Sequence, residues 1–346
     1  MQTKPQLFQS ILIIKRGALG DLLAGTAGIL AVRKQYPTAN ICLLSDSMAY
    51  SVCPPGTIVN EVINEKDYLE TKLGYLKLWR LLRKRKFDLI INMRWVSEVS
   101  GILTLLGGSK FTAGAGAWWL RKMFTFSPPI SFHEANCHEY LLNLRIVQSL
   151  GFELQEPQLY IHKSNDDLEF ADVFYRNANL VASQVLILTP IASTPLKAWP
   201  PDRFIEVSKK FIGQFNAHIL ITYAPQDELA AIEIKNAIGD NAILAPKTSV
   251  NQLAALVSKA ALCLCNNSGI MHVAFAVKTP VVCINTSIGW APYGEWNVAI
   301  TQLPKQPDQS DNRRLTNPQT YELLKQISVE RVWKALSEKW ISLNLK

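Results

Sequence analysis

The chain has 346 residues, of which 48% are apolar and 18% are charged, and its formal net charge is +8. This composition excludes a disordered or fibrous protein, and the length predicts two globular domains of roughly 100–200 residues each. A positive surplus of this size favours an anionic partner, which can be a nucleotide phosphate, a nucleic acid or an anionic membrane.

The six cysteines occur without a CxxC pair, and most of them lie within apolar runs. This pattern is typical of buried thiols in a reducing compartment and predicts a cytoplasmic protein. No secretory signal follows the polar N-terminal segment. No stretch reaches about 18 apolar residues, so no membrane-spanning helix is expected. No cluster with metal-ligand spacing is visible either.

The first half of the chain alternates short apolar runs with helical patterns. Runs at 11–14, 41–44 and 87–92 predict strands, and a glycine-bearing turn at 17–20 leads from the first run into a helix. Strands that are apolar throughout indicate a parallel sheet covered by helices on both faces.

The second half repeats this alternation. Strands are expected at 185–190, 218–223, 262–265 and 281–284, and helices at 203–211, 226–238 and 319–345. We therefore predict an α/β fold of two Rossmann-like domains. The expected division is an N-terminal domain over 1–160, a C-terminal domain over 161–320, and a final helix over 321–346 that can pack back on either domain.

The turn between the first strand and the first helix is the first candidate site. It lacks the GxGxxG spacing of a dinucleotide-binding loop. Ligands of open parallel sheets bind at the carboxyl ends of strands, where N–H groups of a helix start can hold an anion or a sugar oxygen. Asp21 falls in the first helical turn, where it can either cap the helix or act as a general base.

Residues 11–44, with Leu-Gly-Asp at the turn and Tyr-Pro-Thr-Ala before the second strand, resemble the opening of the bacterial heptosyltransferase family, glycosyltransferase family 9. This resemblance implies the GT-B architecture, in which two Rossmann-like domains face a central cleft, with the acceptor on the N-terminal domain. It also implies that Asp21 is the catalytic base. The acceptor side of the turn is then formed by Lys15, Arg16 and Gly20.

A loop and a strand–helix turn in the second half match later motifs of the same family. Lys197 stands two residues before Trp-Pro, where a cation would stabilise a departing nucleotide diphosphate. The turn within 265–274 offers helix N–H groups and a serine hydroxyl to a phosphate. The resemblance implies a donor site formed by Thr194, Asp227, Asn267, Ser268, Gly269, Met271 and His272.

Two positions leave the identity of the donor undecided. The family usually has aspartate where this chain has Asn267, and an amide keeps one acceptor oxygen but loses the charge. Asp227, or alternatively Glu228, matches an acidic residue that contacts the ribose of the nucleotide in relatives, and the helix dipole explains either residue equally well. The resemblance implies ADP-heptose as the donor, with no bound cofactor and no metal.

Two segments combine apolar and basic residues. Residues 73–86 form an amphipathic helical pattern that ends in four consecutive cations, and residues 118–124 pair two tryptophans with two cations. Such segments can lie on an anionic bilayer, although packed helices with a solvated basic face explain them too. They predict a cytoplasmic protein that can associate with the inner face of the inner membrane.

The predicted activity is an inverting, metal-independent transfer of a sugar from a nucleotide diphosphate to a lipopolysaccharide-core or other lipid-linked glycan. Asp21 takes the proton of the acceptor hydroxyl while Lys197 stabilises the leaving group. Two alternatives remain open: a nucleotide-sugar epimerase on the same fold, and a non-catalytic nucleotide-sugar-binding relative. No nucleic-acid-binding signature occurs, so nucleic acid is not expected as a partner.

Overall fold

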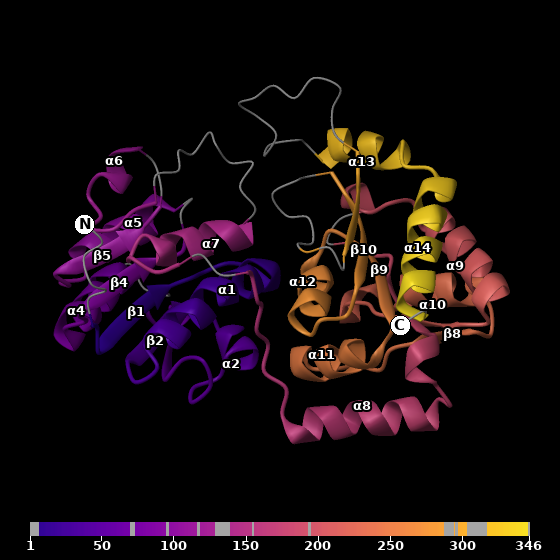
Figure 1. Cartoon of the computed structure of the whole chain (residues 1–346), viewed down its shortest axis with the longest axis horizontal. Helices are drawn as coiled ribbons and strands as arrows, with labels where there is room; N and C mark the ends of the chain where they lie inside the picture. The colour runs from indigo at the N-terminus through magenta and orange to yellow at the C-terminus, as the bar shows by residue number, and fades with distance from the viewer. Residues whose placement is uncertain are drawn as a thin grey trace. The chain divides into compact units, whose positions relative to one another are not determined.

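The computed structural model describes residues 7–69, 73–94, 97–115, 118–128, 139–153, 156–192, 195–286, 294, 297–302 and 317–344. The chain forms two compact units, Met1–His162 and Lys163–Lys346. Each unit is built around one parallel sheet with helices on both faces (Figure 1). The α/β prediction is therefore confirmed.

The first unit contains a five-stranded sheet in the order β3-β2-β1-β4-β5, with every neighbouring pair parallel. Its strands are β1 (Ser10–Ile14), β2 (Asn40–Ser45), β3 (Glu61–Asn64), β4 (Leu89–Asn92) and β5 (Phe111–Gly114). Its helices are α1 (Leu19–Gln35), α2 (Ala49–Val52), α3 (Lys66–Leu69), α4 (Gly74–Arg85), α5 (Glu98–Leu106), α6 (Trp118–Arg121) and α7 (Glu139–Gln148). Because the chain leaves β1 toward β2 and returns to β4 on the other side, the topological switch point lies between β1 and β4.

Both faces of this sheet are buried. Leu12 of β1 packs in one apolar cluster with Leu78 of α4 and Leu103 of α5. Ile11 and Ile13, which point to the opposite face, are also fully buried. Burial on both faces explains why the first strand is apolar without interruption.

The second unit contains a six-stranded parallel sheet in the order β11-β10-β9-β6-β7-β8. Its strands are β6 (Val185–Thr189), β7 (His218–Ile221), β8 (Ala242–Leu244), β9 (Leu262–Asn266), β10 (Val281–Asn285) and β11 (Val298–Thr301). Its helices are α8 (Asn165–Asn177), α9 (Pro201–Phe215), α10 (Glu228–Ile238), α11 (Val250–Lys259), α12 (Gly269–Ala276), α13 (Asn317–Lys325) and α14 (Val329–Asn344), with short 3-10 turns η2 (Ala182–Gln184), η3 (Pro195–Lys197) and η4 (Pro225–Asp227). The switch point lies between β6 and β9.

Two apolar clusters cover the two faces of this sheet. One contains Phe204 and Phe211 of α9 together with Trp340 of α14. The other contains Cys263 and Cys265 of β9, which share a face as their CxC spacing predicts. Within the described residues no helix has both the length and the apolar character that crossing a bilayer requires.

The C-terminal segment differs from its prediction, because two helices replace the single helix expected over 319–345. The helix is interrupted between α13 and α14, and Ile327 in the interruption is fully buried. The indole Nε1 of Trp199 donates a hydrogen bond to the carbonyl of Ile327 at 2.9 Å, and Arg203 donates to the same carbonyl at 2.8 Å. An uninterrupted helix would use this carbonyl internally, so the break anchors the segment to the second unit.

Candidate active site

Asp21 lies at the carboxyl edge of the first sheet, in the helix that follows β1, the strand that borders the switch point. It is half-buried in the first turn of α1, next to half-buried Gly20. Its Oδ2 atom accepts a hydrogen bond from the backbone N–H of Ala18 at 3.2 Å. The carboxylate makes no other hydrogen bond to the described residues. Asp21 therefore caps the helix with one oxygen, and the other oxygen remains available to a ligand.

Arg94, which the sequence analysis did not single out, lies beside Asp21. Gly17 has a φ of 139°, and a Cβ added to it would lie 2.5 Å from Nη1 of Arg94 and 2.6 Å from Cβ of Asp21. The guanidinium of Arg94 also donates to the carbonyl of Arg16. Glycine at position 17 thus lets a guanidinium and the candidate base both lie against the backbone of the turn. The available signal was the position of Arg94, directly after the strand that pairs with β1.

Arg16 forms an ion pair with Glu65, which follows β3. Burial raises the pKa of the Glu65 carboxyl, and the Arg16 and Arg94 guanidiniums oppose that rise. The turn around Asp21 therefore carries two guanidiniums and one carboxylate besides the candidate base. These charges balance, but Arg94 forms no ion pair with the described residues, so its guanidinium can bind an anionic group of a ligand.

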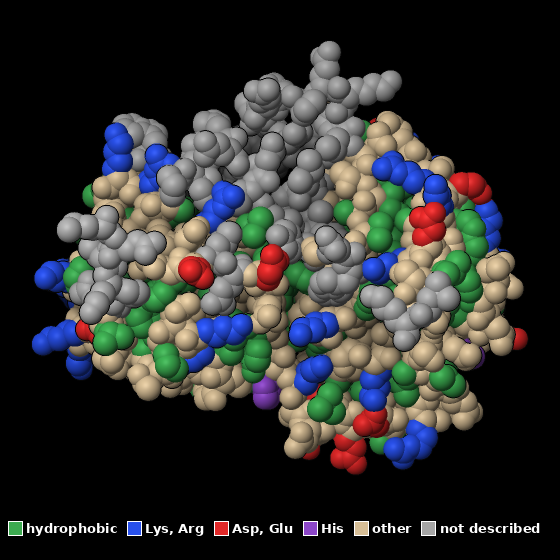
Figure 2. Space-filling view, viewed as in Figure 1, with side chains coloured by type: hydrophobic (Ala, Val, Ile, Leu, Met, Phe, Trp, Pro, Cys, Tyr) green, Lys and Arg blue, Asp and Glu red, His purple; other side chains and the backbone are tan. Residues whose placement is uncertain are grey.

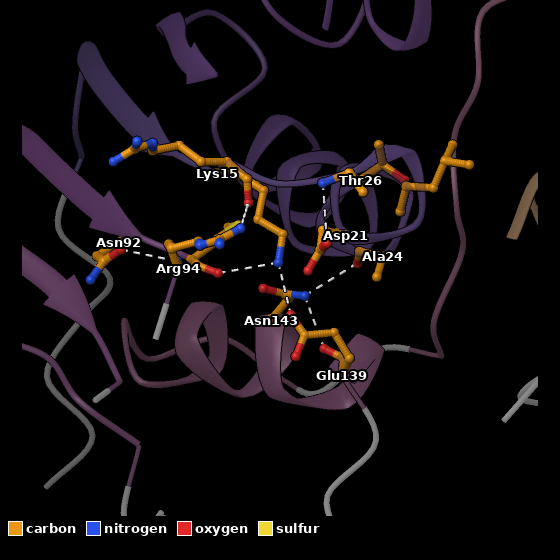
Figure 3. A network of polar contacts seen from close by, with 12 residues as sticks. Lys15, Asp21, Ala24, Thr26, Asn92, Arg94, Glu139 and Asn143 are labelled. Atoms are coloured by element: carbon orange, nitrogen blue, oxygen red, sulfur yellow. Dashed lines mark hydrogen bonds and ion pairs between the residues drawn. The ribbon is translucent and has the colours of Figure 1, made fainter. Parts of the chain in front are cut away.

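Lys15 is buried, with only 2% of its surface exposed. A side chain that contacts the acceptor would be open to solvent. The Lys15 ammonium donates to Glu139, the first residue of α7, at 2.8 Å and to the carbonyl of Met93 at 3.2 Å (Figure 3). Its aliphatic stem fits against Gly25, where an added Cβ would lie 2.6 Å from Cγ of Lys15. Lys15 therefore ties β1, β4 and α7 together beneath the Asp21 turn.

In the second unit, the turn from β9 into α12 borders the other switch point. Ser268 is the N-cap residue of α12, and Gly269 is the first helical residue. The Oγ atom of Ser268 is buried and has no hydrogen-bond partner among the described residues. A buried hydroxyl without a partner is costly, so it marks a place where a ligand oxygen fits. Helix α12 begins at this turn, and the first N–H groups of a helix have no carbonyl of a preceding turn to bond.

Met271 and His272 lie deeper than Ser268. The side chain of Met271 is fully buried in the apolar cluster with Cys263 and Cys265, so what it presents toward the turn is its backbone. Its N–H donates to the carbonyl of Ser268 at 3.1 Å. His272 is 3% exposed.

Asn267 is paired with a residue from the neighbouring strand. Its Nδ2 atom donates to Oδ1 of Asn285, at the end of β10, at a distance of 2.8 Å. An aspartate at position 267 could not donate this bond, although it could accept one from the Asn285 amide. Asn285 is a second asparagine that the sequence analysis did not single out. The site therefore carries a neutral amide pair at this point.

Lys197 ends η3 in the loop after β6, and its side chain is exposed and forms no ion pair with the described residues. Fully buried Asn266 clamps this loop at both ends: its Nδ2 donates to the carbonyl of Pro190 at 3.0 Å, and its Oδ1 accepts from the N–H of Trp199 at 2.9 Å. One side chain next to Asn267 thus couples the Lys197 loop to the α12 turn. Thr194 lies outside the described residues.

Asp227 precedes α10, after β7, and is half-buried without a side-chain hydrogen bond to the described residues. Glu228, the other candidate, forms an ion pair with Lys247 at 3.2 Å. Of the two carboxylates, that of Asp227 is therefore the one without an ion pair to the described residues. The described residues contain no group of three or more His, Cys, Asp or Glu side chains that could hold a metal ion.

The sequence profile of glycosyltransferase family 9 (heptosyltransferase) matches residues 75–319. The chain belongs to this family. It is thus a glycosyltransferase, as its motifs predict. A family 9 relative, the lipopolysaccharide core heptosyltransferase OpsX of Haemophilus influenzae, is 26% identical over 305 residues that cover 85% of this chain and 84% of the relative.

Solved structures of family 9 members share the fold. A family 9 glycosyltransferase from Veillonella parvula has a TM-score of 0.82 at 22% identity, covering 97% of this chain and 99% of the other. The ADP-heptose lipopolysaccharide heptosyltransferase II of Escherichia coli has a TM-score of 0.72 at 20% identity, covering 96% and 99%. The prediction of two Rossmann-like domains of the GT-B type is confirmed.

Proposed function

We propose that this family 9 glycosyltransferase transfers a heptose from ADP-heptose to a sugar of a lipopolysaccharide core, with inversion at the anomeric carbon and without a metal. Support for the acceptor comes from the name of the Haemophilus relative, a lipopolysaccharide core heptosyltransferase. Support for the donor comes from the name of the E. coli enzyme, which includes the word ADP-heptose.

The buried hydroxyl of Ser268, which has no hydrogen-bond partner in the part of the chain that the structure describes, carries the proposal. A diphosphate oxygen is the group that fits there best, because it would accept a hydrogen bond from the hydroxyl and from helix N–H groups together. In the proposed complex Gly269 leaves room for that oxygen, and Lys197 supplies the neutralising charge from the clamped loop.

The proposed reaction is a single displacement. The acceptor oxygen forms a bond to the anomeric carbon while the bond from that carbon to the diphosphate breaks, and its electron pair leaves with ADP. Asp21 takes the proton of the acceptor hydroxyl, using the carboxylate oxygen that does not cap α1. Arg16 and Arg94 hold an anionic group of the acceptor near Asp21, and Gly20 keeps the approach open.

The remaining residues of the donor site have defined proposed roles. Asp227 accepts hydrogen bonds from the ribose hydroxyls, and Asn267 binds a sugar hydroxyl through its carbonyl oxygen. Thr194, Met271 and His272 complete the site, Met271 through its backbone. Lys15 acts indirectly by holding the turn that carries Asp21. Since Lys197 and helix N–H groups supply the positive charge that a departing diphosphate needs, the reaction requires neither metal nor cofactor.

Thermal unfolding in the presence of nucleotides tests the donor site. ADP and ADP-heptose are expected to raise the melting temperature with increasing concentration, because ligands that bind only the folded state stabilise it by mass action. Ser268→Ala removes the hydroxyl without adding bulk, and is expected to weaken this shift. Ser258→Ala provides the control, since the Ser258 hydroxyl donates to the carbonyl of Ala255 within α11. Equal shifts in all three proteins would contradict the assigned site.

The neutral Asn267–Asn285 pair favours one second candidate, a nucleotide-sugar binder that does not catalyse transfer. It would give the same thermal shifts without releasing ADP when the acceptor is added. An Asn267→Asp variant distinguishes the two. It would gain transfer activity if the amide disables catalysis, whereas in an active enzyme it would place a negative charge near the diphosphate and raise the KM for the donor.

A further inference from the structure

Helix α5 of the first unit exposes a line of apolar side chains. Val99, Ile102 and Leu106 are 43%, 43% and 52% exposed. Their spacing of three and four residues places them along one stripe of the helix. The inner side of α5 is anchored in the core through Leu103, so the stripe is not needed for packing within the unit.

Contacts join this stripe to the helices on either side. On one side, the indole Nε1 of Trp79 in α4 donates to the carbonyl of Leu106 at 2.9 Å. On the other side, Leu120 of α6 packs on α5, since a Cβ added to Gly101 would lie 3.0 Å from both of its terminal methyl carbons. Helices α4, α5 and α6 therefore form one continuous surface, here named the docking surface.

Cations flank the apolar stripe. The α4 part of the docking surface exposes Lys77, Arg80, Arg83 and Lys84. The Arg83 guanidinium lies 5.5 Å from the centre of the Trp79 ring. On the α6 side, exposed Lys122 and Met123 follow the helix. In Figure 2, Lys and Arg side chains project from the left edge of the first unit, where Figure 1 draws α4. Glu98 is the one carboxylate within these three helices.

We propose that the docking surface binds an anionic lipid bilayer, with the α5 stripe at the acyl boundary and the flanking cations at the headgroups. The identity of the partner follows from the combination of the two features. A symmetric contact between two copies would bring the cations of both against each other, which costs free energy. Binding to the bilayer does not depend on the proposed function. Only the purpose of that binding, which is to bring a lipid-borne acceptor within reach of the enzyme, rests on it.

Sedimentation with vesicles tests the docking surface directly. The full chain is expected to sediment with phosphatidylcholine vesicles that contain phosphatidylglycerol, and much less with phosphatidylcholine alone. Replacing Arg80, Arg83 and Lys84 with Gln is expected to lower the partition coefficient on the order of a hundredfold at low salt. Replacing Val99, Ile102 and Leu106 with Ser is expected to lower it about tenfold at any salt concentration.

Val181→Ser, Leu229→Ser and Ile341→Ser in one variant form the matched control, because these exposed apolar residues belong to the second unit. This control is expected to bind vesicles as the unchanged chain does. Circular dichroism checks that each variant is folded. Unchanged vesicle binding by both test variants would overturn the proposal. So would a concentration-dependent dimer that the serine variant abolishes, because a second copy would then cover the stripe.

Two acceptors separate this proposal from the proposed function. With an acceptor in vesicles, both test variants are expected to transfer sugar more slowly than the unchanged chain, whereas with a delipidated acceptor they are expected to match it. Loss of transfer to both acceptors in the test variants alone would overturn docking as the role of this surface. If the unchanged chain transfers to neither acceptor yet binds anionic vesicles, the proposed function fails and the docking proposal stands.

Discussion

Asn266 accepts a hydrogen bond from the backbone N–H of Trp199 at 2.9 Å, and this bond connects the two halves of the proposed diphosphate site. The same amide donates to the carbonyl of Pro190 at the other end of the loop. Both ends of the loop that carries Lys197 are therefore held by one residue of β9. The position of Lys197 thus depends on a side chain that is itself fully buried.

Asn266→Ala is expected to lower the free energy of unfolding, because each buried group left unpaired costs about 1–3 kcal/mol. The released Lys197 loop should also raise the KM for the donor about tenfold, which corresponds to a loss of about 1.4 kcal/mol in binding. Asn241→Ala is the control, since Asn241 donates to Ala217 at 3.4 Å at the opposite, amino end of its strand. Steady-state kinetics that show an unchanged KM in Asn266→Ala, despite lower stability, would argue against the clamp.

Asp21→Asn separates capping from catalysis. The amide oxygen can still accept the hydrogen bond from Ala18, so the helix keeps its cap, but the base is lost. We expect kcat to fall about 10²–10⁴-fold with little change in melting temperature. Asp167→Asn is the matched control, because Asp167 accepts from the N–H of Ser164 at 2.9 Å in the first turn of α8. A normal kcat in Asp21→Asn would leave Asp21 with the capping role alone.

Gly17→Ala tests the close packing of Arg94 and Asp21. Its φ of 139° strains any side chain, and the added Cβ would collide with both residues. Gly56→Ala is the control. It has the same kind of backbone strain, since φ is 87°, but no collision, because nothing lies within 4 Å of an added Cβ. Activity should therefore fall much further in Gly17→Ala than in Gly56→Ala. Equal kcat values in the two variants would contradict the placement of Arg94.

The buried pair of Lys15 and Glu139 gives a prediction about stability. Lys15→Met leaves the Glu139 carboxylate buried without its ammonium partner, which is expected to cost about 3–5 kcal/mol. Adding Glu139→Gln removes the charge and should restore much of that loss. Urea unfolding of the two variants measures both effects. A double variant less stable than Lys15→Met would show that the carboxylate has a stronger partner than Lys15.

The strands that the sequence predicts are those in the middle of each sheet. β1, β2 and β4 of the first sheet and β6, β7, β9 and β10 of the second lie between two neighbours and under helices on both faces. Their apolar runs are continuous for that reason. The four edge strands, β3, β5, β8 and β11, lack such runs. Polar or glycine residues fall within β3, β5 and β11, and β8 has only three residues, so their sequences alone do not predict strands.

The turns that carry Asp21 and Ser268 with Gly269 could be predicted, because each follows an apolar strand. The partners that hold these residues come from elsewhere in the chain. Glu139 meets Lys15 across 124 positions, and Asn285 meets Asn267 through strand pairing. No local pattern marks such partners, because only the order of strands in the sheet brings them together. Arg94 lies between these two cases. Its place after a predicted strand could be read from the sequence, but its contact with the turn that carries Asp21 could not.

The most direct test of the central claim is mass spectrometry of a lipopolysaccharide-core acceptor incubated with the chain and ADP-heptose, with ADP measured in the same reaction. The account predicts that the acceptor gains one heptose for each ADP released, and that Asp21→Asn abolishes both products together. An unmodified acceptor, with ADP-heptose either intact or isomerised, would contradict it.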